Sequence, residues 1–226
     1  MSVAWPGTRF IRRVKSSGTA KPFGSAWVVA LRAGEVDCVS KFDCAALTNS
    51  GFATIAVESP IVPGTGLIPS NRGSQSRPDP RHPAGVGPGK RPRLTPNPAL
   101  AIKGRDQFLP FGTPGGDVQT QAMLQVLLNL FVFGQHVQSA IESPRFATYS
   151  FPSSFAPFEY YPGRLAIEGR IPEPVIAELT RRGHEIQRWP DWIWTAGAVC
   201  AILADRRRGV LEAGADPRRA AYAIGW

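Results

Sequence analysis

The sequence predicts an α+β fold, and three features of its second half carry the prediction. Two short apolar segments, 94–103 and 107–111, are separated by a polar turn, as in a pair of antiparallel strands. A longer segment after them repeats its apolar residues at helical spacing, and a second pair of short apolar segments lies near the end of the chain. Strands mixed with packed helices in this way are typical of layered domains, including αββα sandwiches.

The main helix is predicted to begin at Asp117, a residue type that caps helices, and to end at Gly134. Leu124, Leu128 and Val132 widen its apolar stripe, so we expect the helix to be buried on most sides. The stripe itself consists of Met123, Val126, Leu127, Leu130 and Phe131.

Two shorter helices are predicted after it. A brief helix through Ala140 has to stop before Pro144, because the residue that precedes a proline avoids helical backbone angles. Another helix starts near Pro174 and is closed by Gly183.

The end of the chain predicts a hairpin, since residues 196–204 and 208–212 flank a turn. Beyond it, Asp216 and Arg218 are expected to form a structural ion pair at a turn. An aromatic-rich stretch before the hairpin is expected to lie in the core and at interfaces; it comprises Tyr160, Tyr161, Trp189, Trp192 and Trp194.

The first part of the chain has a different texture. Residues 1–36 are basic, rich in small residues and without sustained periodicity, so we expect a poorly ordered leader before a domain at 37–226. Between 60 and 93 the chain is crowded with Gly, Pro, Ser and Asn, which is typical of a long loop that is either functional or disordered.

Composition argues against several classes of function. The 226 residues are 43% apolar and include no run of roughly 18 apolar residues that would span a membrane. The net charge of +9 is spread over scattered arginines without a nucleic-acid-binding motif, so nucleic-acid binding ranks last among our hypotheses. Cys38, Cys44 and Cys200 lack metal-ligand spacing, so we expect no metal or other cofactor. Their odd number argues against a disulfide scaffold and favours a reducing cytoplasm. His82 and His184 adjoin loop signals and are expected at the surface.

The most informative motif is FGTPGGDVQTQ, residues 111–121. Gly115 and Gly116 directly precede the predicted helix, so their backbone N–H groups can stabilise an oxyanion without obstruction by side chains, and the helix dipole adds to this effect. Turns of this kind also occur for purely conformational reasons. The motif alone therefore leaves a catalytic and a structural interpretation open.

The motif belongs to a series that follows one order along the chain. The series is PGTG (63–66), NRG (71–73), HP (82–83), PGKRP (88–92), the strand pair, PGGD (114–117), ESPR (142–145), RGH (182–184) and ADPRR (215–219). In this order the segment from about Pro60 to Trp226 resembles the catalytic, small subunit of the gamma-glutamyltransferase (gamma-glutamyltranspeptidase) family, and most closely its bacterial gamma-glutamyltransferase-like branch. The resemblance implies the αββα sandwich of an N-terminal-nucleophile hydrolase, of which this chain holds only the small-subunit portion.

The resemblance also implies an activity and a site. Such enzymes cut their own chain to free a threonine, which attacks the gamma-glutamyl carbonyl of compounds such as glutathione; an amino acid or water then accepts the acyl group. By position, Gly115 and Gly116 correspond to the oxyanion-binding pair. Arg72 and Thr95 correspond to substrate contacts at the α-amino and carboxylate end, and Gln75 stands where many members have an aspartate.

The nucleophile departs from the family pattern, because the stretch GEVDCVSKFDCAALTNSGFAT (34–54) has no Thr-Thr or Asp-Thr pair. If the loop before Ser59 is shorter than usual, Cys38 follows the cleavage junction after Asp37 and takes the place of the threonine. Another register puts Ser40 there. A third interpretation makes neither residue a nucleophile.

Family precursors also carry a large subunit, which supplies half of the sandwich and an arginine for the substrate carboxylate. At most 37 residues precede the junction here, so an isolated small subunit would expose surface meant for burial. Two main hypotheses remain: a gamma-glutamyltransferase-like acyltransferase or hydrolase of cytoplasmic location, though family members are also periplasmic, and an inactive truncated fragment that needs a large-subunit partner. Self-cleavage between Asp37 and Cys38 distinguishes them.

Overall fold

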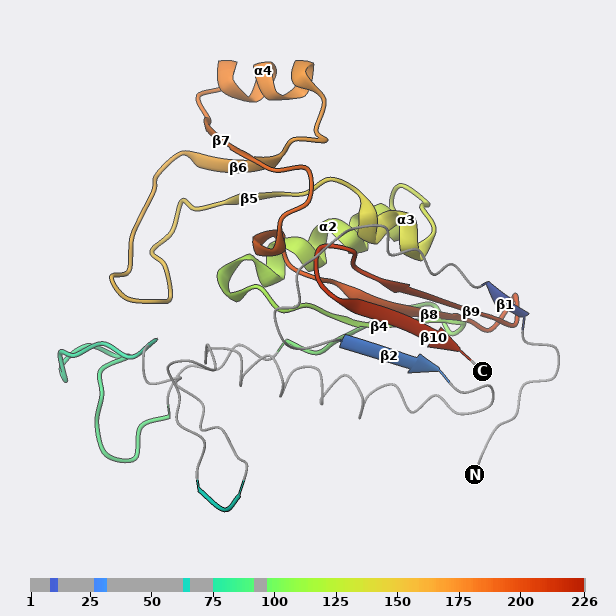
Figure 1. The fold of residues 1–226 in the computed structure, drawn as a ribbon, viewed down its shortest axis with the longest axis horizontal. Coiled ribbons are helices and arrows are strands. Elements are labelled where there is room, and N and C mark those ends of the chain that lie inside the picture. The colour runs from blue at the N-terminus through green and yellow to red at the C-terminus, as the bar shows by residue number, and fades with distance from the viewer. Residues whose placement is uncertain (1–8, 12–26, 32–62, 66–74, 92–96, 226) are drawn as a thin grey trace.

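The computed structural model describes residues 9–11, 27–31, 63–65, 75–91 and 97–225 (Figure 1). In this part of the chain, helices and sheets are stacked in layers. The predicted α+β class is therefore confirmed.

The central sheet consists of β1 (Arg9–Ile11), β9 (Val210–Ala215), β8 (Cys200–Asp205), β4 (Gln107–Gly112) and β3 (Ala99–Lys103), in that spatial order. Strand β1 runs parallel to β9, and all other neighbours are antiparallel. Both predicted hairpins, β3–β4 and β8–β9, are confirmed, and β8 joins them by pairing with β4. The second hairpin begins later than predicted, because a 3-10 helix, η3 (Trp194–Ala196), occupies the start of the expected strand.

Two helices, α2 (Gln119–Phe131) and α3 (Val137–Glu142), cover one face of this sheet (Figure 1). Leu109, Val126, Ile141 and Val199 are completely buried between the helices and the sheet. The approach of α3 to β9 is close, since a Cβ atom at Gly214 would lie 2.7 Å from Ile141 Cδ1. The presence of both predicted helices is therefore confirmed.

Helix α2 departs from the prediction in two respects. The helix starts at Gln119 without a side-chain cap, and Asp117 lies in the preceding 3-10 helix, where its carboxylate binds another segment. The helix is also not buried on most sides: Leu124, Leu128 and Val132 are 54%, 39% and 66% exposed. A sheet covers only one stripe of a helix, and within the described residues nothing buries the second stripe.

The second face of the central sheet packs against another strand pair. Strand β10 (Ala221–Gly225) pairs in parallel with β2 (Trp27–Leu31), and Ala221 packs on a cluster that includes Cys200, Ile202 and Leu211. The order helix, sheet, sheet gives three of the four layers of an αββα sandwich. The expected partial sandwich is confirmed in this sense.

A smaller sheet lies beyond α2 and was not predicted. It consists of β5 (Phe146–Thr148), β6 (Arg164–Glu168) and β7 (Glu185–Trp189), with β6 in the middle. Helix α4 (Glu173–Arg181) covers one face by packing on Ile167. The other face packs Ala166 and Trp189 against Ala196 of η3. Helix α4 itself is confirmed, with Pro174 in its first turn and Gly183 at φ 93° after its end.

Two further predictions concern the aromatic stretch and the leader at residues 1–36. Of the aromatic stretch, Trp189 is buried, but Trp192 and Trp194 are 44% and 57% exposed, because their rings stack with arginines instead of entering the core. In the expected leader, β1 and β2 are strands, and the other residues of 1–36 lie outside the described part. The domain boundary near residue 37 therefore stays a prediction.

Candidate active site

The glycine pair lies on the turn that joins β4 to the helical layer. Gly115 and Gly116 have φ angles of 143° and 58°, which favour glycine because a side chain is strained there. A 3-10 helix, η2 (Gly116–Val118), begins at this turn and leads into α2, so both N–H groups lie near the positive end of a helix. Among the residues that the structure describes, neither amide donates a hydrogen bond. Two free donors in this position are suited to bind an oxyanion.

Thr113 fixes the backbone just before the glycine pair. Its hydroxyl donates to the Pro114 carbonyl at 2.7 Å and accepts the Ala198 N–H at 2.7 Å. The Thr113 carbonyl in turn accepts Nε2 of Gln119 at 3.0 Å. Thr113 and Gln119 are buried, so these bonds are shielded from water and hold the turn in one conformation.

Gly197 packs directly on the same turn. A Cβ atom at Gly115 would lie 3.4 Å from Gly197 Cα, and one at Gly197 would lie 2.8 Å from Thr113 Oγ1. Gly197 also has a positive φ of 90°. The two backbones can therefore approach each other only because both positions are glycine.

The segment 149–163 packs against the glycine turn from another side. Asp117 accepts hydrogen bonds from the backbone N–H of Ser154, at 2.7 Å, and from its hydroxyl. The neighbouring Phe155 places its ring next to Gly116, with Cε2 3.4 Å from the position that a Cβ atom would take. Asp117 therefore positions a loop beside the glycine pair and does not cap the helix.

The segment 75–91 reaches the same loop. Gln75 is 3% exposed at the start of this segment, and the Arg77 guanidinium stacks on the Phe158 ring at 3.4 Å. The segment that holds Gln75 and the turn that holds Gly115 and Gly116 thus both contact the loop 149–163. The other predicted site residues, namely Cys38, Ser40, Arg72 and Thr95, lie outside the described residues.

Sequence reasoning missed several residues that shape this turn. Thr113 stood inside the motif, and its hydroxyl next to the glycine pair was a usable signal. Gly197, Ser154 and Phe155 gave no signal, because each acts through contact with a segment far away in the sequence. Such contacts cannot be read from local spacing.

The predicted pair of Asp216 and Arg218 is confirmed, with Nη1 3.1 Å from Oδ1. Both residues are buried, and they belong to a larger ionic cluster with Arg145 and Glu168. The spacing of Asp216 and Arg218 predicted the pair, but not its burial or its two distant partners.

Cys200 has the opposite character from a nucleophile. It is a free, buried thiol, and burial raises its pKa to about 12, an effect to which the nearby Asp216 carboxylate adds. A thiol attacks as its thiolate, so Cys200 is unreactive at neutral pH. This residue is therefore structural.

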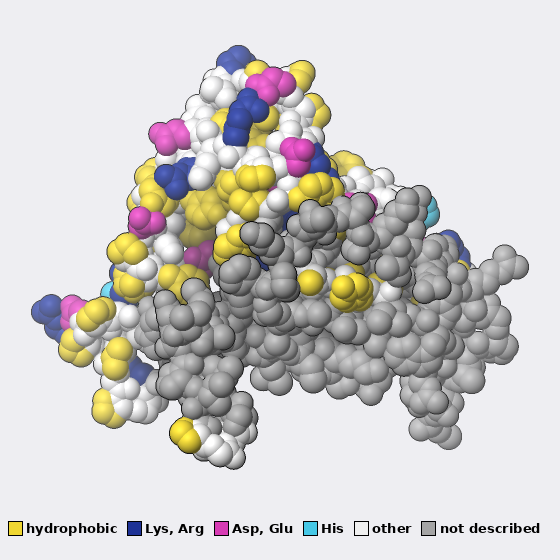
Figure 2. Space-filling model, viewed as in Figure 1, with side chains coloured by type: hydrophobic (Ala, Val, Ile, Leu, Met, Phe, Trp, Pro, Cys, Tyr) yellow, Lys and Arg dark blue, Asp and Glu magenta, His cyan; other side chains and the backbone are white. Residues whose placement is uncertain are grey.

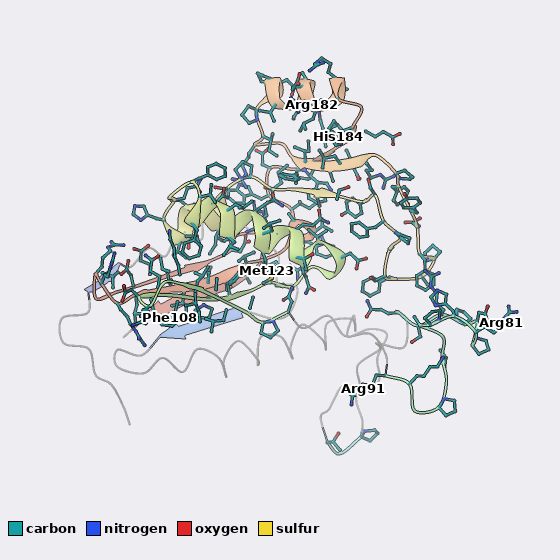
Figure 3. All side chains as sticks on the ribbon, turned by 180° about the vertical axis from the view of Figure 1, so that it is seen from behind. Arg81, Arg91, Phe108, Met123, Arg182 and His184 are labelled. Atoms are coloured by element: carbon teal, nitrogen blue, oxygen red, sulfur yellow. The ribbon has the colours of Figure 1, made fainter. Side chains whose placement is uncertain are left out.

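Two histidines and the charged side chains around α4 lie on the surface and have structural roles. His82 and His184 are exposed, as predicted, and His184 lies beside α4, across the small sheet from Met123 of α2 (Figure 3). On the face seen in Figure 2, acidic and basic side chains are interspersed around α4, where Arg181 and Arg182 pair with Glu178. These are solvated ion pairs.

The described residues contain no group of three or more His, Cys, Asp or Glu residues placed to hold a metal ion. None of their helices is both long and apolar enough to cross a membrane.

The layers and the glycine turn define the class of protein: the chain contains part of the fold of an N-terminal-nucleophile hydrolase. The family model described as Gamma-glutamyltranspeptidase matches residues 56–226. The chain therefore belongs to the gamma-glutamyltranspeptidase family.

Individual relatives agree with this assignment. The chain is 30% identical over 189 residues to the oxamate amidohydrolase proenzyme of Klebsiella pneumoniae and 34% identical over 164 residues to the glutathione hydrolase-like YwrD proenzyme of Bacillus subtilis. These matches cover 79% and 71% of this chain, but only 34% and 29% of the relatives. A crystal structure of acivicin-inhibited gamma-glutamyltranspeptidase matches with a TM-score of 0.58 and 25% identity, over 71% of this chain and 85% of the matched chain. The chain thus spans about a third of the length of the curated relatives.

Proposed function

We propose that this chain supplies the oxyanion-binding part of an active site that cleaves or transfers the acyl group of gamma-glutamyl compounds such as glutathione. The N–H groups of Gly115 and Gly116, which donate no hydrogen bond within the described residues, carry this proposal. These two donors suit a tetrahedral intermediate, because its negative oxygen needs donors that are already in place. The buried bonds of Thr113 keep the donors in place before substrate arrives.

The proposed nucleophile is Cys38, freed by cleavage after Asp37, with Ser40 as the alternative. Its side chain bonds to the acyl carbon while the amide C–N bond breaks, and its proton passes to the leaving amine. Water or an amino acid then takes the acyl group from the enzyme. The buried thiol of Cys200 cannot replace Cys38 in this role, because it remains protonated.

The proposed substrate contacts are Arg72, Gln75 and Thr95. Only Gln75 is described, and its place on the segment that contacts the loop next to Gly116 supports a site between these segments. One relative is named an oxamate amidohydrolase and another a glutathione hydrolase-like protein. Amide cleavage is common to both names, so oxamate is included below as a competing substrate.

We also propose a partner: a polypeptide corresponding to the remaining length of the relatives. Its docking surface would include the exposed apolar stripe of α2 and the outer strand β3, where Leu100 and Ile102 are 52% and 58% exposed. Apolar surface of this kind usually marks an interaction site. The cytoplasm is the proposed location, on the basis of the odd number of cysteines in the sequence.

The test combines intact mass spectrometry with an activity assay on the full chain. Purified protein is incubated and weighed, then assayed with a chromogenic gamma-glutamyl anilide and, separately, for ammonia release from oxamate. Two fragments separating at Asp37 and Cys38, with turnover that Cys38→Ala abolishes and Cys200→Ala does not, would establish the proposal. Loss of turnover in Ser40→Ala but not Cys38→Ala would assign Ser40 instead.

The remaining outcomes separate the alternatives. Turnover of oxamate but not of the anilide would keep the site and change the substrate. A single full-length mass without any turnover would contradict an autonomous enzyme and favour the chain as an inactive part that requires the partner.

A further inference from the structure

An ionic cluster of four side chains is buried in the protein where three segments meet. Arg145 follows α3, Glu168 ends β6, and Asp216 and Arg218 follow β9; their exposed fractions are 2%, 0%, 0% and 7%. Arg145 Nη2 lies 2.7 Å from Asp216 Oδ2, and Arg218 contacts both Asp216, at 3.1 Å, and Glu168, at 2.6 Å. Transfer of four charged side chains from water into the protein interior costs free energy unless each charge is paired.

The cluster is well paired and therefore rigid. Glu168 also accepts the Arg145 backbone N–H at 2.8 Å and the outer arginine Arg170 at 2.9 Å. Burial alone would lower the pKa of Arg218, but hydrogen bonds to Glu168 and the charge of Asp216 outweigh it and raise the pKa overall. A charged guanidinium plane held by several acceptors has little freedom to move.

Arg145 and Asp216 also bind the backbone of one segment outside the cluster. Arg145 Nη1 donates to the Ala196 carbonyl at 3.0 Å. The Val199 N–H donates to Asp216 Oδ2, the same oxygen that Arg145 contacts, at 2.9 Å. This pair therefore holds both ends of the segment 196–199.

The same segment supports the glycine turn. Ala198 donates its N–H to Thr113 Oγ1 at 2.7 Å, and Gly197 packs on Gly115. A displacement of 196–199 would move Thr113 and, with it, the peptide groups of the glycine pair. Catalytic donors must be held to within about 0.5 Å of their working geometry, so a shift of this kind matters for the reaction.

We propose that Arg145 and Asp216 are positioning residues, which set the orientation of the Gly115 and Gly116 amides through the segment 196–199. The catalytic consequence of this positioning rests on the proposed function, since only an acyl-transfer reaction uses these amides. The mechanical link itself is independent of turnover. It can therefore be measured even in a chain that has no activity.

The decisive experiment compares Asp216→Asn with Arg170→Gln by amide ¹H–¹⁵N NMR on the full chain. Arg170→Gln is the matched control, because Arg170 contacts Glu168 but donates nothing to 196–199. In Asp216→Asn we expect the Val199, Gly115 and Gly116 resonances to shift more than those of Gly104 and Gly209, which lie on open turns. In the control the glycine pair should keep its resonances.

A second variant guards against loss of folding. Arg145→Lys keeps the charge but is too short to reach Asp216 and Ala196 together, so it should shift the same resonances as Asp216→Asn. The proposal is overturned if Val199 shifts in either folded variant while Gly115 and Gly116 do not, or if Arg170→Gln shifts them equally.

The activity arm separates this inference from the proposed function. If the wild-type chain turns over substrate, Asp216→Asn should lower kcat on the order of 10-fold or more with little change in KM, because an oxyanion donor acts in the transition state. An unchanged kcat in a folded Asp216→Asn protein would remove the catalytic role. If the wild-type chain is inactive, the proposed function fails and the NMR comparison still decides the mechanical link.

Discussion

Asp117 and Ser154 are joined by two hydrogen bonds across 37 positions of sequence: the carboxylate accepts both the backbone N–H and the hydroxyl of Ser154. This contact ties the segment 149–163 to the glycine turn, where Phe155 lies against Gly116. A residue that looks like a helix cap thus serves as the anchor of a loop beside the candidate active site.

Ser154→Ala should weaken this anchor. The variant loses a hydrogen bond to a charged acceptor, so we expect the free energy of unfolding to fall by about 1–2 kcal/mol. Urea titration measures the change, and limited proteolysis should show faster cleavage within 149–163. Ser153→Ala is the control, because Ser153 Oγ accepts only a longer, neutral bond from Phe155 N–H at 3.2 Å. Equal destabilisation by the two variants would contradict the special role of Ser154.

Gly197→Ala should be more costly than Gly209→Ala for two reasons. Both glycines have positive φ angles, of 90° and 60°, but Gly197 also has ψ −177°, a backbone region that is essentially restricted to glycine and costs alanine about 1–3 kcal/mol. Only at Gly197 would the new Cβ atom meet a neighbour, Thr113 Oγ1, at 2.8 Å, whereas Gly209 has nothing within 4 Å. We expect Gly197→Ala to lose about 1–3 kcal/mol more than Gly209→Ala in denaturant titrations. Similar losses would show that both the backbone strain and the close approach are easily relieved.

Glu168→Gln tests the buried ionic cluster as a source of stability. The variant removes the carboxylate charge that Arg170 and Arg218 share and leaves Asp216 as the carboxylate partner of Arg218; removal of one partner from a buried ion pair destabilises by about 3–5 kcal/mol. Glu178→Gln removes the partner of two arginines on the surface of α4 and should leave the thermal midpoint unchanged. A mild effect of Glu168→Gln would mean that water reaches the cluster.

Cys200 should make stability depend on pH in the alkaline range. The thiol stays protonated in the folded chain because burial raises its pKa from 9.0 to about 12, whereas the unfolded chain releases this proton from about pH 9 upward. The unfolded state then binds fewer protons, so the free energy of unfolding falls as pH rises, by about 1.4 kcal/mol per pH unit.

The measurement compares alkaline unfolding of the wild type with Cys200→Ala. Tyrosines titrate in both proteins, so the difference between their slopes reports the thiol alone. Parallel slopes would show that the thiol ionises equally easily in the folded chain. The same thiol should react with a thiol reagent only after denaturation.

Local patterns in the sequence were sufficient for part of this protein. Short apolar segments on either side of turns predicted β3, β4, β8 and β9, and helical spacing together with Pro174 and Gly183 predicted α4, because such signals depend on residues a few positions apart. The glycine pair could be found for the same reason: strand, two glycines and helix are consecutive. The ordered motifs added the family, which the match over residues 56–226 confirms.

Only the tertiary structure decided which contacts surround those elements. The strands β5, β6 and β7 are short, and their pairing joins segments separated by a loop and a helix, which local propensity does not encode. Asp117 has the local chemistry of a cap, yet its carboxylate accepts hydrogen bonds from Ser154 and not from the first turn of the helix. Gly197 and the Arg145–Asp216 pair gain their roles through distant neighbours alone. The sequence by itself determined most of the elements and the glycine turn, because these are short-range properties. The support behind the turn required the folded chain, since it comes from segments that meet only there.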